Sequence, residues 1–355
     1  MRSLEDRIID LDDDDIFCVY YESAHLPEPP ISDEERQEAM VVARNLIQAR
    51  YDAGTPLFTK EQFRTIVQQL DQCLEDKDET QKRVSVTGLD GQIVWFPVKT
   101  GKESTMHLSV KKHKCFLTKP LLDYHGIESL LWSTRQSYEP VMTACLPVEL
   151  MHQTETRDAQ TGLPVVSRPL PDVETLRAQF QAEQLYWEGS KCFAKLKIMF
   201  DVDQGGVRIP QGTNKVVAFA CSTMTWPEKA DDENGEGSEE VEGKGRDPPM
   251  AQHVLMLAMR ELVQGAAEEA GKKSLEVKCY AQDPMYTPVD KQVLGEVGIT
   301  VLDDPRGFLE VDDNSVVISI SPNIPVKQIV ADIARPAVVI WYRVEPGGDY
   351  DKDPW

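Results

Sequence analysis

The C-terminal half of the chain alternates apolar runs of strand length with amphipathic helical patterns. The runs lie at 215–221, 275–281, 299–302, 315–320 and 337–342, and the helical patterns at 250–270, 288–297 and 325–333. This alternation is typical of a parallel sheet wound with helices. We therefore predict an α/β, Rossmann-like, doubly wound and mainly parallel sheet. Its central strands should bury Val217, Phe219, Val317, Ile318, Val339 and Ile340, because helices cover both faces of such a sheet.

The N-terminal part carries two helix-start signals. Ser32 and Glu35 form a capping-box pattern, which predicts a helix to about Tyr51, and Thr59 with Gln62 repeats the pattern for a second helix. The two helices predict a helical hairpin, followed by a β-rich region at 84–116 with a turn at 89–91. The apolar face of the first helix is expected to contain Ala39, Val42, Ala43, Leu46 and Ile47.

A further cap, Asp172, predicts a long helix that ends at Gly189 and carries Leu176, Phe180, Leu185 and Tyr186. The chain is expected to divide into an acidic, proline-rich and flexible lead-in at 1–31, a helical hairpin plus β-rich region at 32–170, an α/β domain at 171–345 and a flexible tail at 346–355. Residues 228–247 combine acidic side chains with glycine, so we expect a disordered insertion there.

The charge balance argues against nucleic acid and anionic membrane surfaces as partners. The chain has 38 basic and 60 acidic side chains, a net charge of −22, and no Lys/Arg-rich run. Such a chain repels phosphate backbones and anionic lipid, so we expect neither nucleic acid nor a membrane as partner.

The seven cysteines form no C-x-x-C pair, which is typical of reduced thiols. The N-terminus has no apolar signal region, and we predict a cytoplasmic or nuclear protein. Neither metal-ligand spacing nor a catalytic motif such as G-x-S-x-G is present.

A ligand of a doubly wound sheet binds at the carboxyl ends of the strands, where the strand order reverses. The expected crevice is lined by Ser222, Gln252, His253, Asp283, Asp303, Ser321 and Asn323, with Asp304 as the neighbour of Asp303. The loop after the first strand reads Ala-Cys-Ser-Thr-Met-Thr-Trp-Pro and lacks G-x-G-x-x-G, so a dinucleotide fingerprint is absent and the cofactor is unknown.

Local structural roles compete with ligand binding at these positions. Asp283-Pro284 and Asp304-Pro305 are equally typical of turns before proline. Cys221 and Cys279 are expected to be buried apolar residues rather than nucleophiles. His253 is a candidate proton carrier or haem ligand, although a lone histidine in an amphipathic helix is usually structural.

Several separated segments resemble one family. They are Tyr51 to Phe58, Gln252-His253, Tyr280 to Thr287, Leu294 to Ile299, Ser315 to Ser319 and Pro325 to Asp332. These segments are similar to fungal members of the Sensitivity-to-Red-light-Reduced (SRR) domain family. The resemblance implies links to light signalling and the clock, as in plant relatives, or to haem-biosynthesis regulation, microtubule-related processes or proteasome assembly, as in animal and yeast relatives. It supplies no catalytic residues. Relatives often carry a glycine after the first strand, whereas Ala220-Cys221-Ser222 has none.

Two classes of function fit these residues. The missing phosphate loop and catalytic dyad favour a non-catalytic regulatory or interaction protein with a protein partner. The alternative is a Rossmann-like enzyme, most plausibly an S-adenosylmethionine-dependent methyltransferase, that binds a small molecule at the strand ends. There Asp283 would hold a ribose, and Asp303 or Asp304 an adenine amine.

Overall fold

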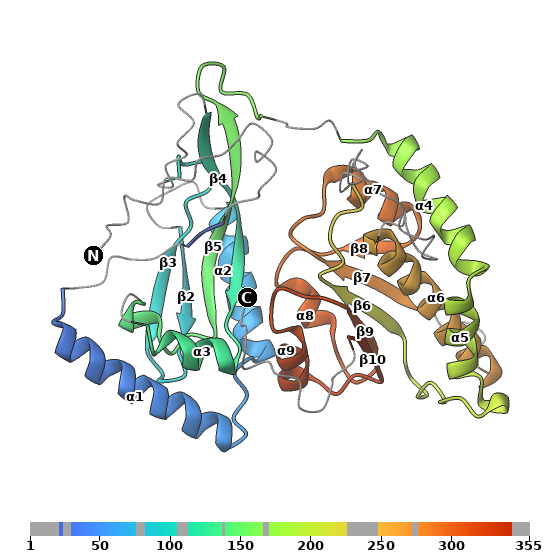
Figure 1. The fold of residues 1–355 in the computed structure, drawn as a ribbon, viewed down its shortest axis with the longest axis horizontal. Coiled ribbons are helices and arrows are strands. Elements are labelled where there is room, and N and C mark those ends of the chain that lie inside the picture. Colours follow the sequence, from blue (N-terminus) through green and yellow to red (C-terminus); the bar gives the residue numbers. More distant parts are fainter. Residues whose placement is uncertain are drawn as a thin grey trace, which may run out of the picture. The chain divides into compact units, whose positions relative to one another are not determined.

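The computed structural model describes residues 21–23, 30–75, 82–104, 113–136, 139–165, 170–225, 248–271 and 276–342 (Figure 1). The chain divides into two compact units. The first unit consists of Met1–Leu170, Asp304–Leu309 and Lys327–Ile333, and the second of Pro171–Asp303, Glu310–Val326 and Ala334–Trp355. The insertion predicted at 228–247, the tail predicted at 346–355 and most of the lead-in at 1–31 lie outside the described residues.

The second unit contains the predicted parallel sheet. Its strands are β6 (Lys215–Phe219), β7 (Lys278–Gln282), β8 (Ile299–Val301), β9 (Ser315–Ser319) and β10 (Val338–Trp341). They lie in the order β10-β9-β6-β7-β8, and all neighbouring pairs are parallel. The strand order reverses between β6 and β9, as in a Rossmann sheet. The predicted α/β fold class is therefore confirmed.

Helices pack on this sheet through apolar side chains. They are α4 (Val173–Glu188), α5 (Lys191–Phe200), α6 (Pro248–Glu269) and α7 (Pro288–Glu296), and the 3₁₀ helix η4 (Val202–Gln204) follows α5. Helix α6 contacts β6 and β7, α7 contacts β8, and α4 packs on α6 and α7. Val254 and Leu257 of α6 join Val216 and Cys279 of the sheet in one buried cluster. Further along the chain are the short helices α8 (Arg306–Glu310) and α9 (Val326–Ile333).

Burial in the sheet follows the position of each strand. Val217, Phe219, Val317 and Ile318 are buried, as predicted for central strands. The prediction was wrong for Val339, which is 39% exposed, and Ile340 is only partly buried. The reason is that β10 forms an edge of the sheet, where neighbours are present on one side only. An apolar run does not distinguish a central strand from an edge strand.

The first unit begins with helices α1 (Asp33–Asp52) and α2 (Lys60–Glu75). The predicted capping box is present, because Ser32 Oγ accepts from Glu35 N–H and the Glu35 side chain accepts from Ser32 N–H. The prediction for Val42 was wrong, since its side chain is 67% exposed. Met40, Ala43 and Ile47 form the buried face instead. Helix α1 packs mainly on α3 (Ile127–Ser133), and α2 on β2 (Arg83–Thr87).

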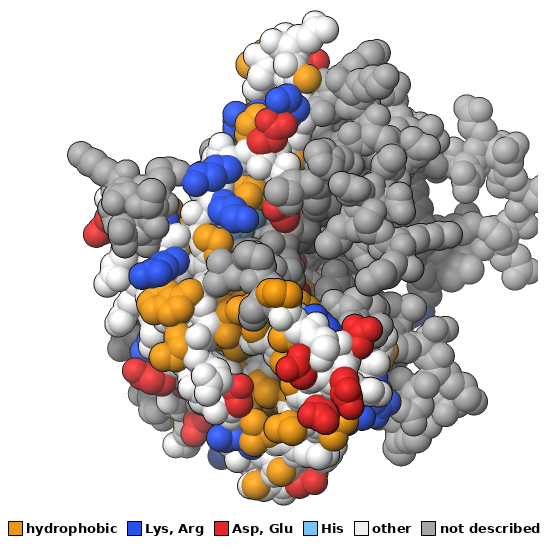
Figure 2. Space-filling view, turned by 90° about the vertical axis from the view of Figure 1, so that its left-hand side faces the viewer, with side chains coloured by type: hydrophobic (Ala, Val, Ile, Leu, Met, Phe, Trp, Pro, Cys, Tyr) orange, Lys and Arg blue, Asp and Glu red, His pale blue; other side chains and the backbone are white. Residues whose placement is uncertain are grey.

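Two small antiparallel sheets complete the first unit. Strand β2 pairs with β3 (Ile93–Pro97), and the predicted turn between them contains Gly91 at φ 82°. The other sheet has the order β1-β5-β4, with β1 (Tyr21–Ser23), β4 (His113–Tyr124) and β5 (Val148–Asp158), and the 3₁₀ helix η3 (Val141–Thr143) precedes β5. Strand β1 lies within the segment expected to be a flexible lead-in. Figure 2 shows the side of the molecule that lies at the left in Figure 1. Apolar side chains gather in the lower half of this view, with acidic side chains beside them.

Segments from the C-terminal half contribute to the core of the first unit. The ring of Phe308 stacks on Phe63 at 5.6 Å between centroids and meets the edge of Tyr124 at 5.5 Å. The Asp304 carboxylate accepts hydrogen bonds from Leu122 N–H and from the Tyr124 hydroxyl. Burial and the nearby Asp304 charge raise the pKa of Tyr124. The first unit is thus assembled from distant parts of the sequence.

Candidate functional site

The loop after β6 has an unusual backbone. Ala220 has φ 55° and Ser222 has φ 62°, in the left-handed region that favours glycine. A non-glycine residue there is strained, by on the order of 1 kcal/mol or more, unless its surroundings hold it. The loop therefore adopts a glycine-like conformation although Ala220-Cys221-Ser222 contains no glycine. Strained backbone at a strand end is a common property of ligand sites.

Asp283, which follows β7, holds this loop. Its Oδ2 accepts from Ser222 N–H at 2.7 Å, and its Oδ1 accepts from Met285 N–H at 2.9 Å. Burial raises the pKa of Asp283 above its ordinary value, although the two backbone hydrogen bonds act in the opposite direction. Both carboxylate oxygens are therefore engaged by the protein's own backbone. The predicted proximity of Ser222 and Asp283 is present, and Asp283 is also the turn residue of the structural alternative.

His253 of α6 reaches the same region through Tyr286. The His253 Nδ1 lies 2.6 Å from the Pro249 carbonyl oxygen, so this nitrogen carries the proton and donates. Its Nε2, 2.7 Å from the Tyr286 hydroxyl, then accepts from that group. Burial lowers the pKa of His253 to about 4. Both ring nitrogens are occupied and the imidazole is neutral at pH 7, which disfavours the proposed roles as proton carrier or haem ligand.

Cys221 completes the cluster around Tyr286. Its thiol is fully buried, lies beside Tyr286 and donates to the Phe219 carbonyl at 3.9 Å. Burial and the nearby Asp283 charge raise the pKa of the Cys221 thiol, so it remains protonated at neutral pH. This environment suits a buried structural thiol and opposes a nucleophilic role.

Sequence reasoning missed Asp290, which connects the loop to α7. Its carboxylate accepts from Thr223 Oγ1 at 2.6 Å, from Met224 N–H at 2.9 Å and from the N–H and hydroxyl of Thr287. Asp290 is completely buried. The Thr287-x-x-Asp290 spacing is a capping-box signal that would have located it, although its contact with Thr223 depends on tertiary structure.

Two buried polar atoms at this end of the sheet have no hydrogen-bond partner among the described residues. They are Gln252 Oε1 on α6 and Ser319 Oγ at the end of β9. Ser319 follows Ile318, which pairs with Ala218 of β6, so it lies at the reversal point of the strand order. A buried polar atom without a partner is costly, and a ligand could satisfy it.

The remaining predicted residues show no contact with this cluster in the described part of the chain. Ser321 and Asn323 are exposed after β9. Asp303 is exposed and lies 3.7 Å from Lys291 Nζ. Asp304 belongs to the first unit, where Leu122 and Tyr124 occupy its carboxylate. The structure thus unites Ser222 and Asp283 directly, and Cys221 and His253 through Tyr286.

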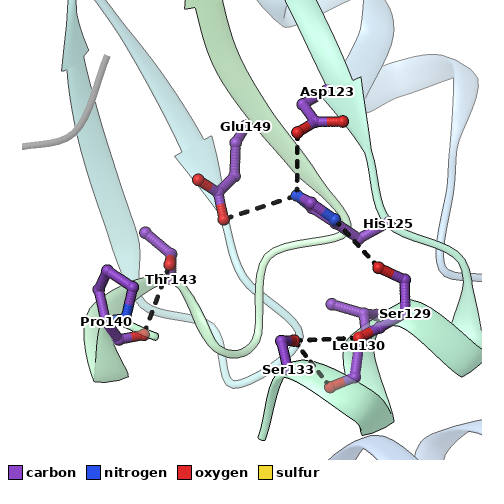
Figure 3. A network of polar contacts seen from close by, with 8 residues as sticks. All are labelled: Asp123, His125, Ser129, Leu130, Ser133, Pro140, Thr143 and Glu149. Carbon is purple, nitrogen blue, oxygen red and sulfur yellow. Dashed lines mark hydrogen bonds and ion pairs between the residues drawn. The ribbon is translucent and has the colours of Figure 1, made fainter. Parts of the chain in front are cut away.

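A second polar cluster lies in the first unit (Figure 3). His125 Nδ1 is 3.4 Å from Ser129 Oγ, while its Nε2 is 3.7 Å from Glu149 and 3.8 Å from Asp123. This composition resembles a Ser-His-acid triad. However, burial and the neighbouring Asp123 charge raise the pKa of Glu149 to about 8, so this carboxyl is mostly neutral at pH 7. A neutral acid does not stabilise an imidazolium, which argues against nucleophilic activation of Ser129.

An exposed apolar surface covers the end of α4, α5 and the segment after it. We call it the α5 surface, and it consists of Leu185, Tyr186, Ile198, Met199, Val202 and Val207, each 46–71% exposed. Val207 N–H donates to the Met199 carbonyl at 2.7 Å, which holds Val207 beside the end of α5. Helix α4 carries Leu176, Phe180, Leu185 and Tyr186 as predicted, and of these four Leu176 and Phe180 are buried whereas Leu185 and Tyr186 are exposed. The buried stripe of α4 ends before them.

In the described ranges, no group of three or more His, Cys, Asp or Glu side chains could hold a metal ion. Within the same ranges, no helix has the length and apolarity needed to cross a membrane.

Comparison with family models identifies part of the second half of the chain. Residues 235–349 match the SRR1 domain. The chain therefore contains an SRR1-like domain. The match includes α6 and β7 to β10 and begins after β6 and its strained loop. No curated protein and no solved structure matches the chain significantly.

Proposed function

We propose that this protein is a non-catalytic regulatory or interaction protein that uses its SRR1-like unit as a scaffold for a protein partner. The α5 surface is the observation that carries this proposal. Its six large apolar side chains lie within 23 consecutive residues, from Leu185 to Val207, and the least exposed of them is 46% exposed. Exposed large apolar side chains that gather on one part of a protein surface are typical of a protein contact.

The charges around the α5 surface favour an acidic partner. Helix α5 contains Lys191, Lys195 and Lys197 and no acidic residue, although the whole chain carries a net charge of −22. Lys195 is exposed, and Lys197 Nζ lies 4.1 Å from the centroid of the Phe193 ring. Apolar side chains bordered by lysines fit a partner segment that combines apolar anchors with carboxylates.

The polar residues after β6 and β7 support the same proposal. We call them the strand-end cluster, and they are Cys221, Ser222, His253, Asp283, Tyr286 and Asp290. A ribose-binding acid needs a free carboxylate, whereas Asp283 already accepts two backbone hydrogen bonds. The Asp290 carboxylate likewise accepts four hydrogen bonds from the protein itself. The loop that holds phosphate in dinucleotide enzymes is fastened here by internal carboxylates, which disfavours an anionic cofactor.

Family resemblance suggests where such a protein acts. Fungal-type SRR relatives, and the links of the family to signalling, the clock or haem-related regulation, are consistent with a regulatory role. Of the six free cysteines in the described ranges, five are buried and Cys192 is exposed, which suits a reducing compartment. We therefore place the protein in the cytoplasm or nucleus as part of this proposal.

The test compares partners of the full-length protein with those of surface variants. The Ile198→Asp/Met199→Asp variant places charge in the α5 surface, and Val42→Asp places charge at an apolar residue of α1 that is 67% exposed. Affinity purification with quantitative mass spectrometry should show at least one protein reduced by about ten-fold only in the first variant, equivalent to about 1.4 kcal/mol of binding. An identical set of proteins with both variants would contradict the proposal.

A Rossmann-like enzyme is the second candidate, most plausibly an S-adenosylmethionine-dependent methyltransferase. It is favoured by the strained backbone at Ala220 and Ser222 and by the unpartnered Ser319 Oγ beside it in the sheet. Thermal-shift measurements with S-adenosylmethionine, nicotinamide nucleotides and haem distinguish the two candidates. A rise in melting temperature with one of these ligands, abolished by Ser319→Ala, would support the enzyme hypothesis. The scaffold predicts no shift with any of them.

A further inference from the structure

A polar hollow lies at the amino end of β7, away from the strand-end cluster. Its volume is about 550 Å³. Its lining comes from α6, from β7 with the residues before it, and from the start of β8. The polar side chains in that lining are Arg260, Gln264, Glu276, Lys278, Tyr280 and Thr300. Small-molecule sites typically have volumes of about 300 to 1,000 Å³, so the hollow has the size of a metabolite site.

The strand register places Lys278 at the amino end of β7, next to the start of β8. Cys279 pairs with Ile299 and Tyr280 with Thr300, so β7 begins one residue before β8 does. Lys278 is therefore beyond the end of β8 and is exposed. Arg260 and Gln264 are one helical turn apart on α6 and lie on the same side of that helix.

The two cations of the hollow have no carboxylate partner among the described residues. Arg260 Nη1 donates to the Val297 carbonyl at 2.9 Å, and its guanidinium also contacts the Cys279 thiol. Lys278 makes no side-chain ion pair in the described ranges, and Glu276 is the one acidic side chain in the lining. In a chain with 60 acidic and 38 basic side chains, two cations without a carboxylate partner among the described residues are unexpected in the lining of one hollow.

The fixed position of Arg260 adds to this arrangement. Gly298 has φ 80°, and a Cβ at this position would lie 3.0 Å from Arg260 Nη1. Because Gly298 has no side chain, the Arg260 guanidinium can pack directly against the backbone of this turn. A guanidinium anchored through one nitrogen keeps other N–H groups for a ligand, and little entropy is lost when they bind.

We propose that this hollow binds a small organic anion that carries carboxylate or phosphate groups, with Arg260 and Lys278 as its charged contacts. The side chains of Gln264, Tyr280 and Thr300 supply neutral hydrogen-bond donors around them. Glu276 favours an anion that also carries a hydroxyl or amino donor. The site lies at the amino ends of the strands, so it is separate from the strand-end cluster and independent of the proposed scaffold function.

The test uses isothermal titration calorimetry of the full-length protein with citrate for the carboxylate source and inorganic phosphate for the phosphate source. Ionic strength is held constant with sodium chloride. Lys278→Gln removes one charged contact at an exposed position, and Lys102→Gln is the matched control because Lys102 is an exposed lysine of the first unit. Lys278→Gln should weaken binding of citrate or phosphate by about ten-fold, while Lys102→Gln leaves it unchanged.

Each outcome decides the proposal. Loss in Lys278→Gln alone supports the site, and the probe that binds more tightly identifies the preferred anionic group. An equal loss in both lysine variants indicates non-specific attraction and overturns the proposal, as does the absence of binding heat with both probes. A thermal melt of Lys278→Gln without ligand, unchanged from the parent protein, shows that any loss of binding does not come from unfolding.

Discussion

The Asp332 carboxylate accepts hydrogen bonds from the backbone N–H of Phe58 at 3.1 Å. The same oxygen accepts from Leu57 N–H at 2.8 Å, across 275 residues of sequence. Asp332 and Phe58 end two of the segments that resemble SRR proteins, and in the structure both belong to the first unit. These segments therefore have a shared structural role, in which an acidic side chain of α9 fixes the chain just before α2.

The first prediction is that Asp332→Ala lowers the free energy of unfolding by about 2 kcal/mol, because two buried donors lose a charged acceptor. Asp332→Asn keeps an acceptor oxygen in the same place and should lose less. Urea denaturation of both variants measures the difference. Equal losses in the two variants would show that the carboxylate oxygen is not the essential group.

The second prediction concerns Phe308, which is completely buried against Phe63 and Tyr124. Phe308→Ala should cost about 3 to 5 kcal/mol through lost contacts and a cavity. Leu185→Ala, at a 71% exposed position, should stay within about 0.5 kcal/mol of the parent protein in the same denaturation experiment. Comparable effects would contradict the assignment of Phe308 to the core.

The third prediction is a loss of stability in acid caused by two buried histidines. Burial lowers the pKa of His253 and that of His152 to about 4, below the ordinary value of 6.5. The unfolded chain therefore binds protons first, and stability falls as the pH is lowered from about 6.5 to about 4, by up to about 1.4 kcal/mol per pH unit for each group. Melting temperatures measured across this range should be flatter for His253→Gln than for the parent protein. If the melting temperature of His253→Gln changed with pH as steeply as that of the parent protein, His253 would not be buried in its neutral form.

Glu149 leads to the opposite pH dependence. Burial raises its pKa from 4.5 to about 8, so the folded protein holds this proton more tightly than the unfolded chain does. The stabilising contribution of this group is complete below pH 4.5 and is lost as the pH rises to about 8. Glu149→Gln should remove this dependence and raise the melting temperature relative to the parent protein at pH 8. A variant that melts lower at pH 8 than at pH 5, by the same amount as the parent protein, would refute the assignment.

The fifth prediction tests the strain after β6. Ser222→Gly should stabilise the protein by about 0.5 to 1 kcal/mol, because glycine adopts a φ of 62° without a steric penalty. Ser321→Gly is the control, since Ser321 is exposed and is not among the described residues with positive φ. The control should not gain stability in thermal denaturation. A destabilised Ser222→Gly would mean that the side chain of Ser222 contributes more than its backbone conformation costs.

Local signals predicted much of the second unit. The apolar and amphipathic patterns identified β6 to β10 and the helices α6, α7 and α9, because a strand buried on both faces must be apolar along its length. The helix caps at Ser32 and Asp172 were also predictable from the sequence, since their hydrogen bonds join residues three apart.

Side-chain exposure was not predictable from the sequence in the same way. Val42, Leu185 and Val339 are apolar by sequence and exposed in the fold, because burial depends on what lies opposite each residue.

The candidate site was only partly predictable. Ser222 and Asp283 follow neighbouring parallel strands, so topology placed them together, and their hydrogen bond agrees with that placement. The sequence contained no indication that Tyr286 would join Cys221 and His253, or that Asp290 would bind Thr223. Such contacts depend on side-chain directions across separate elements, and no local pattern encodes those directions.

By itself the sequence determined the parallel α/β class, the helix caps and the acidic character of this protein, because periodicity, capping and charge are properties of residues close in the chain. Only the tertiary structure decided the membership of Phe308 and Asp332 in the first unit, the left-handed backbone at Ser222 and the presence of Arg260 and Lys278 in the lining of one hollow. These features require segments far apart in sequence to meet, and the free energy that selects such meetings comes from packing the whole chain.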